Sequence, residues 1–132
     1  MIEQELIDIC ENADDSLDLS NKKINDDDCL TIICYFRGSK LNLNSNEIGD
    51  RGAKYLSCFM GSKLLLSMNN IGNIGARYLS VWSGSQLDLS SNHIESAGAS
   101  HLDKWKGDIL NLSYNDIGSS SKYFKITKLS KL

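Results

Sequence analysis

One pattern recurs along most of this 132-residue chain at a step of 23 residues. Its clearest copies are LNLNSNEIGDRGAKYL, LLLSMNNIGNIGARYL, LDLSSNHIESAGASHL and LNLSYNDIGSSSKYFK, which begin at Leu41, Leu64, Leu87 and Leu110. A weaker copy, LDLSNKKINDDDCLTI, begins 24 residues before the first of these, at Leu17. A repeat of this length predicts a solenoid, because each unit can bury its apolar side only against its neighbours.

The copies follow the template L-x-L-x-x-N-x-I-x-x-x-G-A-x-x-L, and each part of it predicts local structure. The paired leucines, such as Leu41 and Leu43, alternate with polar residues and indicate a short strand with one apolar face. Five such strands side by side predict a parallel sheet. The Gly-Ala pair that begins at Gly52 places the smallest side chains where a return helix must approach the sheet.

An asparagine recurs where each strand must turn, in the column Asn46, Asn69, Asn92 and Asn115. A side-chain amide has donors and an acceptor that can satisfy buried backbone groups of adjacent units. We therefore predict a structural role for this column. A glycine also stands three residues before the next leucine, as at Gly61 and Gly84, and it is expected to end the helix in a left-handed conformation.

These motifs resemble the leucine-rich repeat family over residues 17 to about 126, and the segment N-x-I-G-x-x-G-A-x-x-L resembles its ribonuclease-inhibitor-like subclass. The resemblance implies an α/β solenoid of five units of about 23 residues, with a parallel concave sheet and short convex helices. The short repeats, the absence of proline and the abundance of Lys, Asn and Ser are similar to small leucine-rich repeat effectors of intracellular bacterial pathogens.

We expect a single domain over residues 1–132, because this length and 41% hydrophobic residues suffice for one core. The end coils of a solenoid must be covered, since they would otherwise expose core leucines to water. The expected division is therefore a capping segment at each end with the repeats between them: 1–15, 16–118 and 119–132.

Both caps are predicted to be helical. Ile2, Leu6 and Ile9 lie at helical spacing near the N-terminus, and Tyr123 and Ile126 begin a run of apolar residues at steps of three near the C-terminus. Acidic residues fill the exposed positions of the first segment, and lysines fill those of the second.

The chain ends in SKL, which at a free carboxyl terminus is a peroxisomal import signal. The same letters precede strands at residues 39–41 and 62–64, and a sixth unit would place its leucine at position 133. We therefore interpret the ending as the stump of a further repeat or the end of the cap. The N-terminus is acidic and no run of 18 apolar residues occurs, so neither an export signal nor a membrane span is expected.

The cysteines favour a reducing, cytosolic compartment. They lack the density and spacing of a disulfide framework, and we expect free thiols at all four: Cys10, Cys29, Cys34 and Cys58. Of these, Cys34 and Cys58 are expected to be half-buried packing residues on successive helices. If the protein is a bacterial effector, the resemblance implies delivery into the host cell without a classical signal peptide.

The net charge of −3 argues against a general nucleic-acid binder. The average conceals a polarity, because residues 1–28 contain ten acids and two lysines whereas the rest of the chain is basic. This polarity is either an ordinary solvated surface or a means of steering a partner electrostatically.

Motifs of catalysis and of metal binding are absent from the sequence. It contains no H-E-x-x-H, P-loop or G-x-S-x-G, and His93 and His101 occupy different repeat positions. We therefore expect neither an enzyme, nor a cofactor, nor a metal site. By analogy with GTPase-activating proteins of this repeat class, a GTPase-activating role through Arg37, Arg51 or Arg77 is a less favoured alternative.

The outward side chains of the concave strands form the candidate partner-binding site: Lys40, Asn42, Lys63, Leu65, Met68, Asp88, Ser91, His93, Ile109, Asn111, Tyr114 and Asp116. Most positions of these columns are small and polar, and Leu65, Met68, Ile109 and Tyr114 are the apolar exceptions. Met68 and Tyr114 belong to strands about 10 Å apart with Ser91 between them, so we expect them to wall a shallow slot. Aromatic residues and methionine are enriched at interface centres.

A second stripe recurs in register on the convex helices, at Tyr55, Tyr78, His101 and Phe124. Side chains at equivalent positions of adjacent helices can pack against one another or bind a partner. We interpret this stripe as packing between neighbouring helices.

The sequence therefore predicts a non-catalytic protein-protein interaction module that is a monomer on its own. The resemblance implies that it inhibits or regulates a partner protein by occlusion, as an effector would act on a host protein or on another effector enzyme. The alternative is an adaptor that links a target to a larger complex such as a ubiquitin ligase. No nucleic acid and no membrane is expected among its partners.

Overall fold

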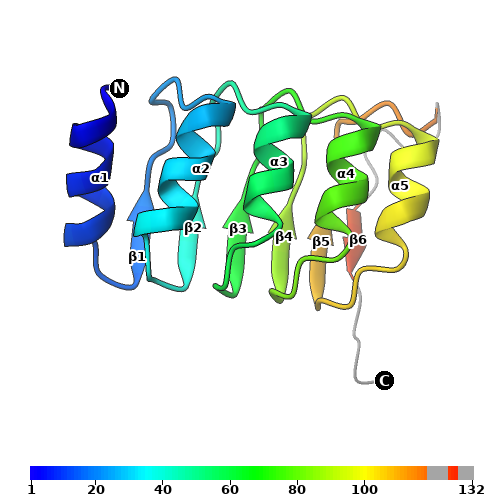
Figure 1. Cartoon of the computed structure of the whole chain (residues 1–132). Helices are drawn as coiled ribbons and strands as arrows, with labels where there is room; N and C mark the ends of the chain where they lie inside the picture. Colours follow the sequence, from blue (N-terminus) through cyan, green and yellow to red (C-terminus); the bar gives the residue numbers. More distant parts are fainter. Residues whose placement is uncertain (119–124, 128–132) are drawn as a thin grey trace.

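Each of the first four repeats forms a three-residue strand followed by a return helix, the fifth contributes a strand, and the five strands line up in one sheet (Figure 1). The computed structural model describes residues 1–118 and 125–127 of the chain. The parallel strands are β1 (Ser16–Asp18), β2 (Lys40–Asn42), β3 (Lys63–Leu65), β4 (Gln86–Asp88) and β5 (Ile109–Asn111). The register pairs the first template leucine of each unit with that of the next, from Leu17 to Leu110.

The helices form a single layer on the other side of the core, as Figure 1 shows. They are α1 (Glu3–Asn12), α2 (Asp26–Tyr35), α3 (Asp50–Leu56), α4 (Asn73–Leu79) and α5 (Ser96–Leu102). The expected α/β solenoid with a parallel sheet and short convex helices is confirmed. Within the described residues, no helix has the length and apolar character needed to cross a bilayer.

The N-terminal cap is helical as expected, but a different face of it is buried. Leu6 and Cys10 lie one turn apart and are buried, and α1 packs against α2. Ile2 and Ile9, which were expected to share the buried face with Leu6, are exposed by 65% and 38% of their surface. Successive residues on a helix point about 100° apart, so Ile9 turns away from the face on which its neighbour Cys10 is buried.

At the C-terminal end, a strand stands where the sequence suggested a helix. β6 (Lys125–Thr127) pairs antiparallel with β5, and Ile126 lies opposite Leu110. A strand here satisfies backbone groups that β5 would otherwise leave unpaired at the edge of the sheet. The rest of the predicted C-terminal cap, with Tyr123, Leu129 and the SKL ending, lies outside the described residues.

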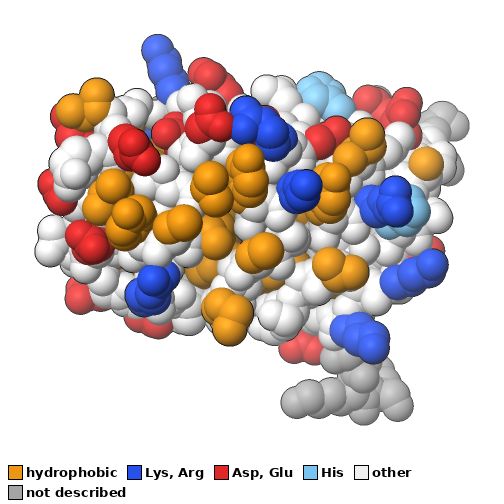
Figure 2. All heavy atoms as spheres, in the orientation of Figure 1, with side chains coloured by type: hydrophobic (Ala, Val, Ile, Leu, Met, Phe, Trp, Pro, Cys, Tyr) orange, Lys and Arg blue, Asp and Glu red, His pale blue; other side chains and the backbone are white. Residues whose placement is uncertain are grey.

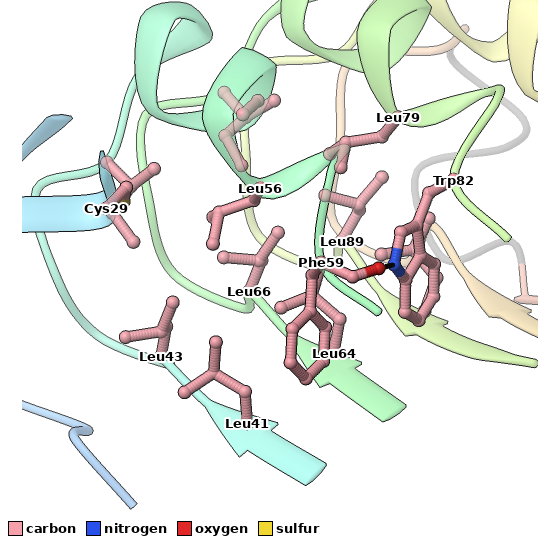
Figure 3. Packing of buried hydrophobic residues seen from close by; sticks show 14 of the residues in the cluster. Cys29, Leu41, Leu43, Leu56, Phe59, Leu64, Leu66, Leu79, Trp82 and Leu89 are labelled. Atoms are coloured by element: carbon pink, nitrogen blue, oxygen red, sulfur yellow. Dashed lines mark hydrogen bonds between the residues drawn. The ribbon is translucent and has the colours of Figure 1, made fainter. Parts of the chain in front are cut away.

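One continuous hydrophobic cluster runs through the repeats between the sheet and the helices. Figure 3 shows its central part, in which Leu41 and Leu64 of the strands, with Leu43 and Leu66 just after them, lie on the sheet side of the cluster and Leu56 on the helix side. All of these side chains are at most 1% exposed. Because every unit contributes the same set, the burial in each unit depends on the units beside it.

A ladder of stacked aromatic rings follows the C-terminal ends of the helices. Phe36, Phe59, Trp82 and Trp105 stack with centroids 6.1, 6.3 and 6.2 Å apart. The indole Nε1–H of Trp82 donates to the carbonyl of Phe59 at 2.9 Å, a bond drawn in Figure 3, and Trp105 donates to Trp82 at 3.0 Å. The ladder therefore joins the helix-to-strand turns of four successive units.

The aromatic ladder also explains the glycines that follow it. The expected left-handed conformation at Gly61 and Gly84 is wrong, since neither has a positive φ. A Cβ atom at Gly84 would instead lie 2.0 Å from Cζ2 of Trp82, and one at Gly61 would lie 2.3 Å from Cζ of Phe59. These positions are glycine because the ring of the preceding aromatic residue folds over them.

The asparagine column has the predicted structural role. Asn69 is 5% exposed, and its Nδ2 group donates to the carbonyls of Leu43 at 2.9 Å and Leu66 at 3.2 Å. Its Oδ1 atom accepts the backbone N–H of Ile48 at 2.9 Å. One amide therefore bonds both its own unit and the preceding one.

We expect Asn69→Ala to lower the free energy of unfolding by at least about 2 kcal/mol, because it strands buried donors and acceptors in two units. Urea denaturation followed by circular dichroism measures this loss. Asn70→Ala removes the same side chain from the neighbouring exposed position and is the matched control, with an expected change within about 0.5 kcal/mol. Equal midpoints for the two variants would contradict the structural role.

Candidate functional site

All twelve residues of the candidate site lie on the strands or on the turns that follow them, and none is fully buried. The strand register brings them together in rows. One row places Lys40 beside Lys63, followed by Gln86 and Ile109. The next row contains Asn42, Leu65, Asp88 and Asn111.

Three of the polar site residues also hold the fold. The Oδ1 atom of Asn42 accepts the backbone N–H of Asn44 at 3.0 Å. Asp88 and Asn111 accept the backbone N–H of the serine two residues later at 2.9 and 3.0 Å. The sequence analysis assigned these residues to binding alone, and it missed this local structural role.

Leu65 stands in the same row and has no such acceptor. The backbone N–H of Ser67, two residues later, instead donates to Oδ1 of Asn44 in the preceding unit at 2.8 Å. The neighbouring unit thus replaces the bond that Leu65 cannot make. An apolar side chain is accommodated here without leaving a backbone donor unsatisfied.

Met68 and Tyr114 combine exposure with an unfavourable backbone. Their surfaces are 60% and 61% exposed, and their φ angles are 59° and 60°. The left-handed region disfavours side chains with a Cβ atom other than Asn and Asp. Equivalent turns hold Asn21, Ser45 and Ser91, also with positive φ, so the template imposes this conformation on whichever residue occupies the position.

The backbone keeps these turns in order along the face. Met68 N–H donates to the carbonyl of Ser90 at 3.0 Å, and Ser91 N–H donates to the carbonyl of Ser113 at 2.8 Å. Ser91, at the turn of the fourth unit, therefore lies between Met68 in the third and Tyr114 in the fifth. The side chain of Met68 contacts the preceding unit, where its Sδ atom accepts from Oγ of Ser45 at 3.6 Å, and the slot between Met68 and Tyr114 stays a prediction.

A shallow hollow of about 210 Å³ lies on the first three strands of the concave face. Its lining comprises Ser16, Leu17, Asp18, Lys40, Leu41, Asn42, Lys63 and Leu65. Lys40 and Lys63 are direct cross-strand neighbours, so their charges repel. Within residues 1–118 the one ion pair joins Arg51 to Asp27 at 2.6 Å, which leaves both lysines without a salt bridge to a described carboxylate.

The convex stripe is consistent with packing between helices. Tyr55, Tyr78 and His101 are half-buried, and Tyr55 packs against the hydrophobic cluster. Lys54 of α3 lies over the ring of Tyr78 in α4, with its Nζ atom 5.7 Å from the centroid. Phe124 lies outside the described residues.

No metal centre forms within residues 1–118, where no three His, Cys, Asp or Glu side chains are placed to hold an ion. His93 is exposed on a concave turn, and His101 lies on a convex helix. Arg51 and Arg77 lie on α3 and α4, whereas Arg37 follows α2. None of the three arginines extends from a long loop.

A family model described as "Leucine Rich repeat" matches residues 39–57, 85–102 and 109–121. The chain therefore contains leucine-rich repeats. Its matched segments belong to the second, fourth and fifth units of the solenoid, and the intervening unit repeats the same strand and helix. Domains of this family generally serve as non-catalytic scaffolds that bind other proteins. A search of curated proteins found no match.

We expect Met68→Asn to raise the free energy of unfolding of this protein by about 0.5 to 1 kcal/mol. Asparagine tolerates the left-handed backbone better than methionine does, and Met68 contributes little burial. Thermal and urea unfolding measure the change. Ile74→Asn is the control, because Ile74 is also 60% exposed but has no positive φ, and a similar gain there would contradict the explanation.

The thiols divide into two pairs. Cys34 and Cys58 are exposed, which contradicts the expected half-burial, because the last helical turns direct Ile32 and Leu56 to the core instead. Cys10 and Cys29 are buried. Burial raises the pKa of Cys10 to about 11, with a smaller contribution from the charge of Glu11, and burial also raises the pKa of Cys29.

Two thiols of the native protein should therefore react rapidly with a disulfide reagent at about pH 8, and all four should react after unfolding. A raised pKa leaves less thiolate, and burial restricts access, so Cys10 and Cys29 are protected twice. The Cys34→Ser, Cys58→Ser double variant should lose the rapid phase. A rapid phase that survives in this variant would show that the buried pair is accessible.

Proposed function

We propose that this leucine-rich repeat protein binds another protein through its concave face and regulates it by covering a functional surface. The observation that carries the proposal is the set of apolar side chains on this face: Leu65, Met68, Ile109 and Tyr114. Met68, Ile109 and Tyr114 are exposed by 60%, 40% and 61%, so burying them against a partner would contribute a hydrophobic driving force.

The backbone at Met68 and Tyr114 strengthens this proposal. A large side chain at a left-handed turn lowers stability, and the equivalent turns of this chain use Asn or Ser in three units. Neither residue is buried in the core. Binding is a role that would account for residues of this size at these two positions.

The hollow on β1 to β3 suggests the chemistry of one part of the partner. Leu65 and Leu41 supply apolar lining, while Lys40 and Lys63 supply two cations that form no salt bridge within residues 1–118, although Asp18 also lines the hollow. An aspartate or glutamate that follows an apolar side chain would relieve the repulsion between the lysines. We therefore propose that the bound surface of the partner is acidic near this end.

Occlusion is the mechanism favoured for a module of this kind, because a rigid curved sheet can cover an active site without a catalytic group of its own. The resemblance to the ribonuclease-inhibitor-like subclass supports this mechanism. A cytosolic effector that acts on a host protein or on another effector enzyme remains our more specific proposal. An adaptor is the second candidate, and the apolar side chains exposed on the convex face favour it.

The test begins with cross-linked co-purification from the native cell, with the captured proteins quantified by mass spectrometry. A Leu65→Asp, Met68→Asp, Tyr114→Ala triple variant should lose the partner, and titration against the purified partner should show at least a tenfold weaker Kd (about 1.4 kcal/mol). Ile74→Asp is the control, because it introduces the same charge at a convex residue as exposed as Met68.

Two further measurements separate the details. Raising the ionic strength, or introducing Lys40→Glu with Lys63→Glu, should weaken binding if the partner is acidic at the hollow. A 1:1 complex in which an enzyme partner loses activity supports occlusion. If the folded triple variant bound the partner as tightly as the parent protein does, the concave site would be contradicted.

A further inference from the structure

The aromatic ladder arranges the residues on either side of it into two rows on the convex side of the solenoid. The rings of Phe36, Phe59, Trp82 and Trp105 stack in that order, so the residue before each ring and the residue after it also follow one another across four units. We name these two rows the helix-exit ridge: Tyr35, Cys58, Val81 and Lys104, with Arg37, Met60, Ser83 and Lys106.

The middle of the helix-exit ridge is the most exposed apolar surface of the described residues. Met60 is 92% exposed and Val81 is 79% exposed, both more than any apolar residue of the concave face. Cys58 is exposed beside them, and Tyr35 is 38% exposed. Figure 2 shows hydrophobic side chains gathered over α2 to α4 on this face.

Hollows lie between these projecting side chains. One of about 210 Å³ is lined by residues that include Asp15, Arg37, Cys58 and Met60. Another of about 540 Å³ is lined by Ser80, Val81, Trp82, Ser83, Lys104 and Lys106. Residues of the aromatic ladder line both hollows, Phe36 and Phe59 the first and Trp82 the second, so the shape of the ridge depends on packed core residues.

Cations stand at both ends of the apolar stretch. Arg37 lies in the first unit, and Lys104 and Lys106 lie in the fourth. Met60 and Val81, in the second and third units, therefore have cations on both sides along the ridge. Within residues 1–118 the only ion pair is that of Arg51 with Asp27, at the opposite ends of the helices. The charges of the bracketing cations are therefore not neutralised by a salt bridge to a described carboxylate.

We propose that the helix-exit ridge is a second protein-binding surface whose occupant is a segment with apolar side chains flanked by aspartate or glutamate. Apolar side chains of the segment would enter the hollows beside Met60 and Val81, and its acids would lie against Arg37, Lys104 and Lys106. The proposal does not depend on the concave site, because no residue of the ridge lines the hollow on β1 to β3.

An anionic membrane also attracts apolar and basic groups, but the same convex side argues against it. The helix starts carry Asp26, Asp27, Asp28, Asp50 and Glu95, which would repel an anionic bilayer laid along the helices. Discrete hollows, moreover, suit individual side chains. A peptide segment therefore fits the ridge better than a lipid surface does.

The test uses a displayed library of random 16-residue peptides selected on the parent protein. The library is first depleted on a folded Met60→Asp, Val81→Asp variant, so that peptides binding elsewhere are removed. We expect the enriched peptides to combine apolar residues with Asp or Glu, and to bind the parent at least about tenfold more tightly than the depleting variant. Met68→Asp with Tyr114→Asp is the matched control on the concave face and should leave their affinity unchanged.

A charge reversal provides an independent readout. Selection on a Lys104→Glu, Lys106→Glu variant should enrich basic peptides in place of acidic ones. The proposal would be overturned if no peptide bound the parent more tightly than the Met60→Asp, Val81→Asp variant. It would also be overturned if the parent and the Lys104→Glu, Lys106→Glu variant enriched peptides of the same charge. Binding to vesicles of phosphatidylserine that disappears in the same variant would also overturn it, in favour of a membrane.

Discussion

Each unit of this solenoid is held to the next by the buried amide of one asparagine. The amide of Asn69 donates to carbonyls of its own and the preceding unit and accepts a backbone N–H from that preceding unit. Asn92 and Asn115 repeat the arrangement in later units. Since irregular backbone cannot be buried with unpaired groups, the turn beneath the sheet exists only where this amide satisfies it.

The asparagine column has consequences for the concave face. It requires a turn in which the residue before each asparagine takes a left-handed conformation, as at Ser45, Met68, Ser91 and Tyr114. At Met68 and Tyr114 this backbone directs a large side chain away from the core, where it is exposed. The same turn that closes the core thus determines where binding residues can stand and what conformational cost they carry.

The two faces differ in how they present apolar groups. On the concave face, Leu65, Met68 and Tyr114 are spread among polar side chains, three of which also hold their own turns. On the convex face, Met60 and Val81 project from turns that the aromatic ladder fixes beneath them. A scaffold with two such surfaces can cover one protein while it holds another, which is how occlusion and adaptor roles could coexist.

The sequence by itself determined the repeat, the strands, the return helices, the buried asparagines and the concave columns, because these depend on local alternation and spacing. Only the tertiary structure decided the rest. The cap buries Leu6 and Cys10 rather than Ile2 and Ile9, since its rotation follows from the helix beside it. The strand at Lys125–Thr127 forms because an open sheet edge lies within reach. The exposure of Met60 and Val81 depends on the stacking of two rings, Phe59 and Trp82, that are 23 positions apart in the chain. No local sequence pattern indicates that contact.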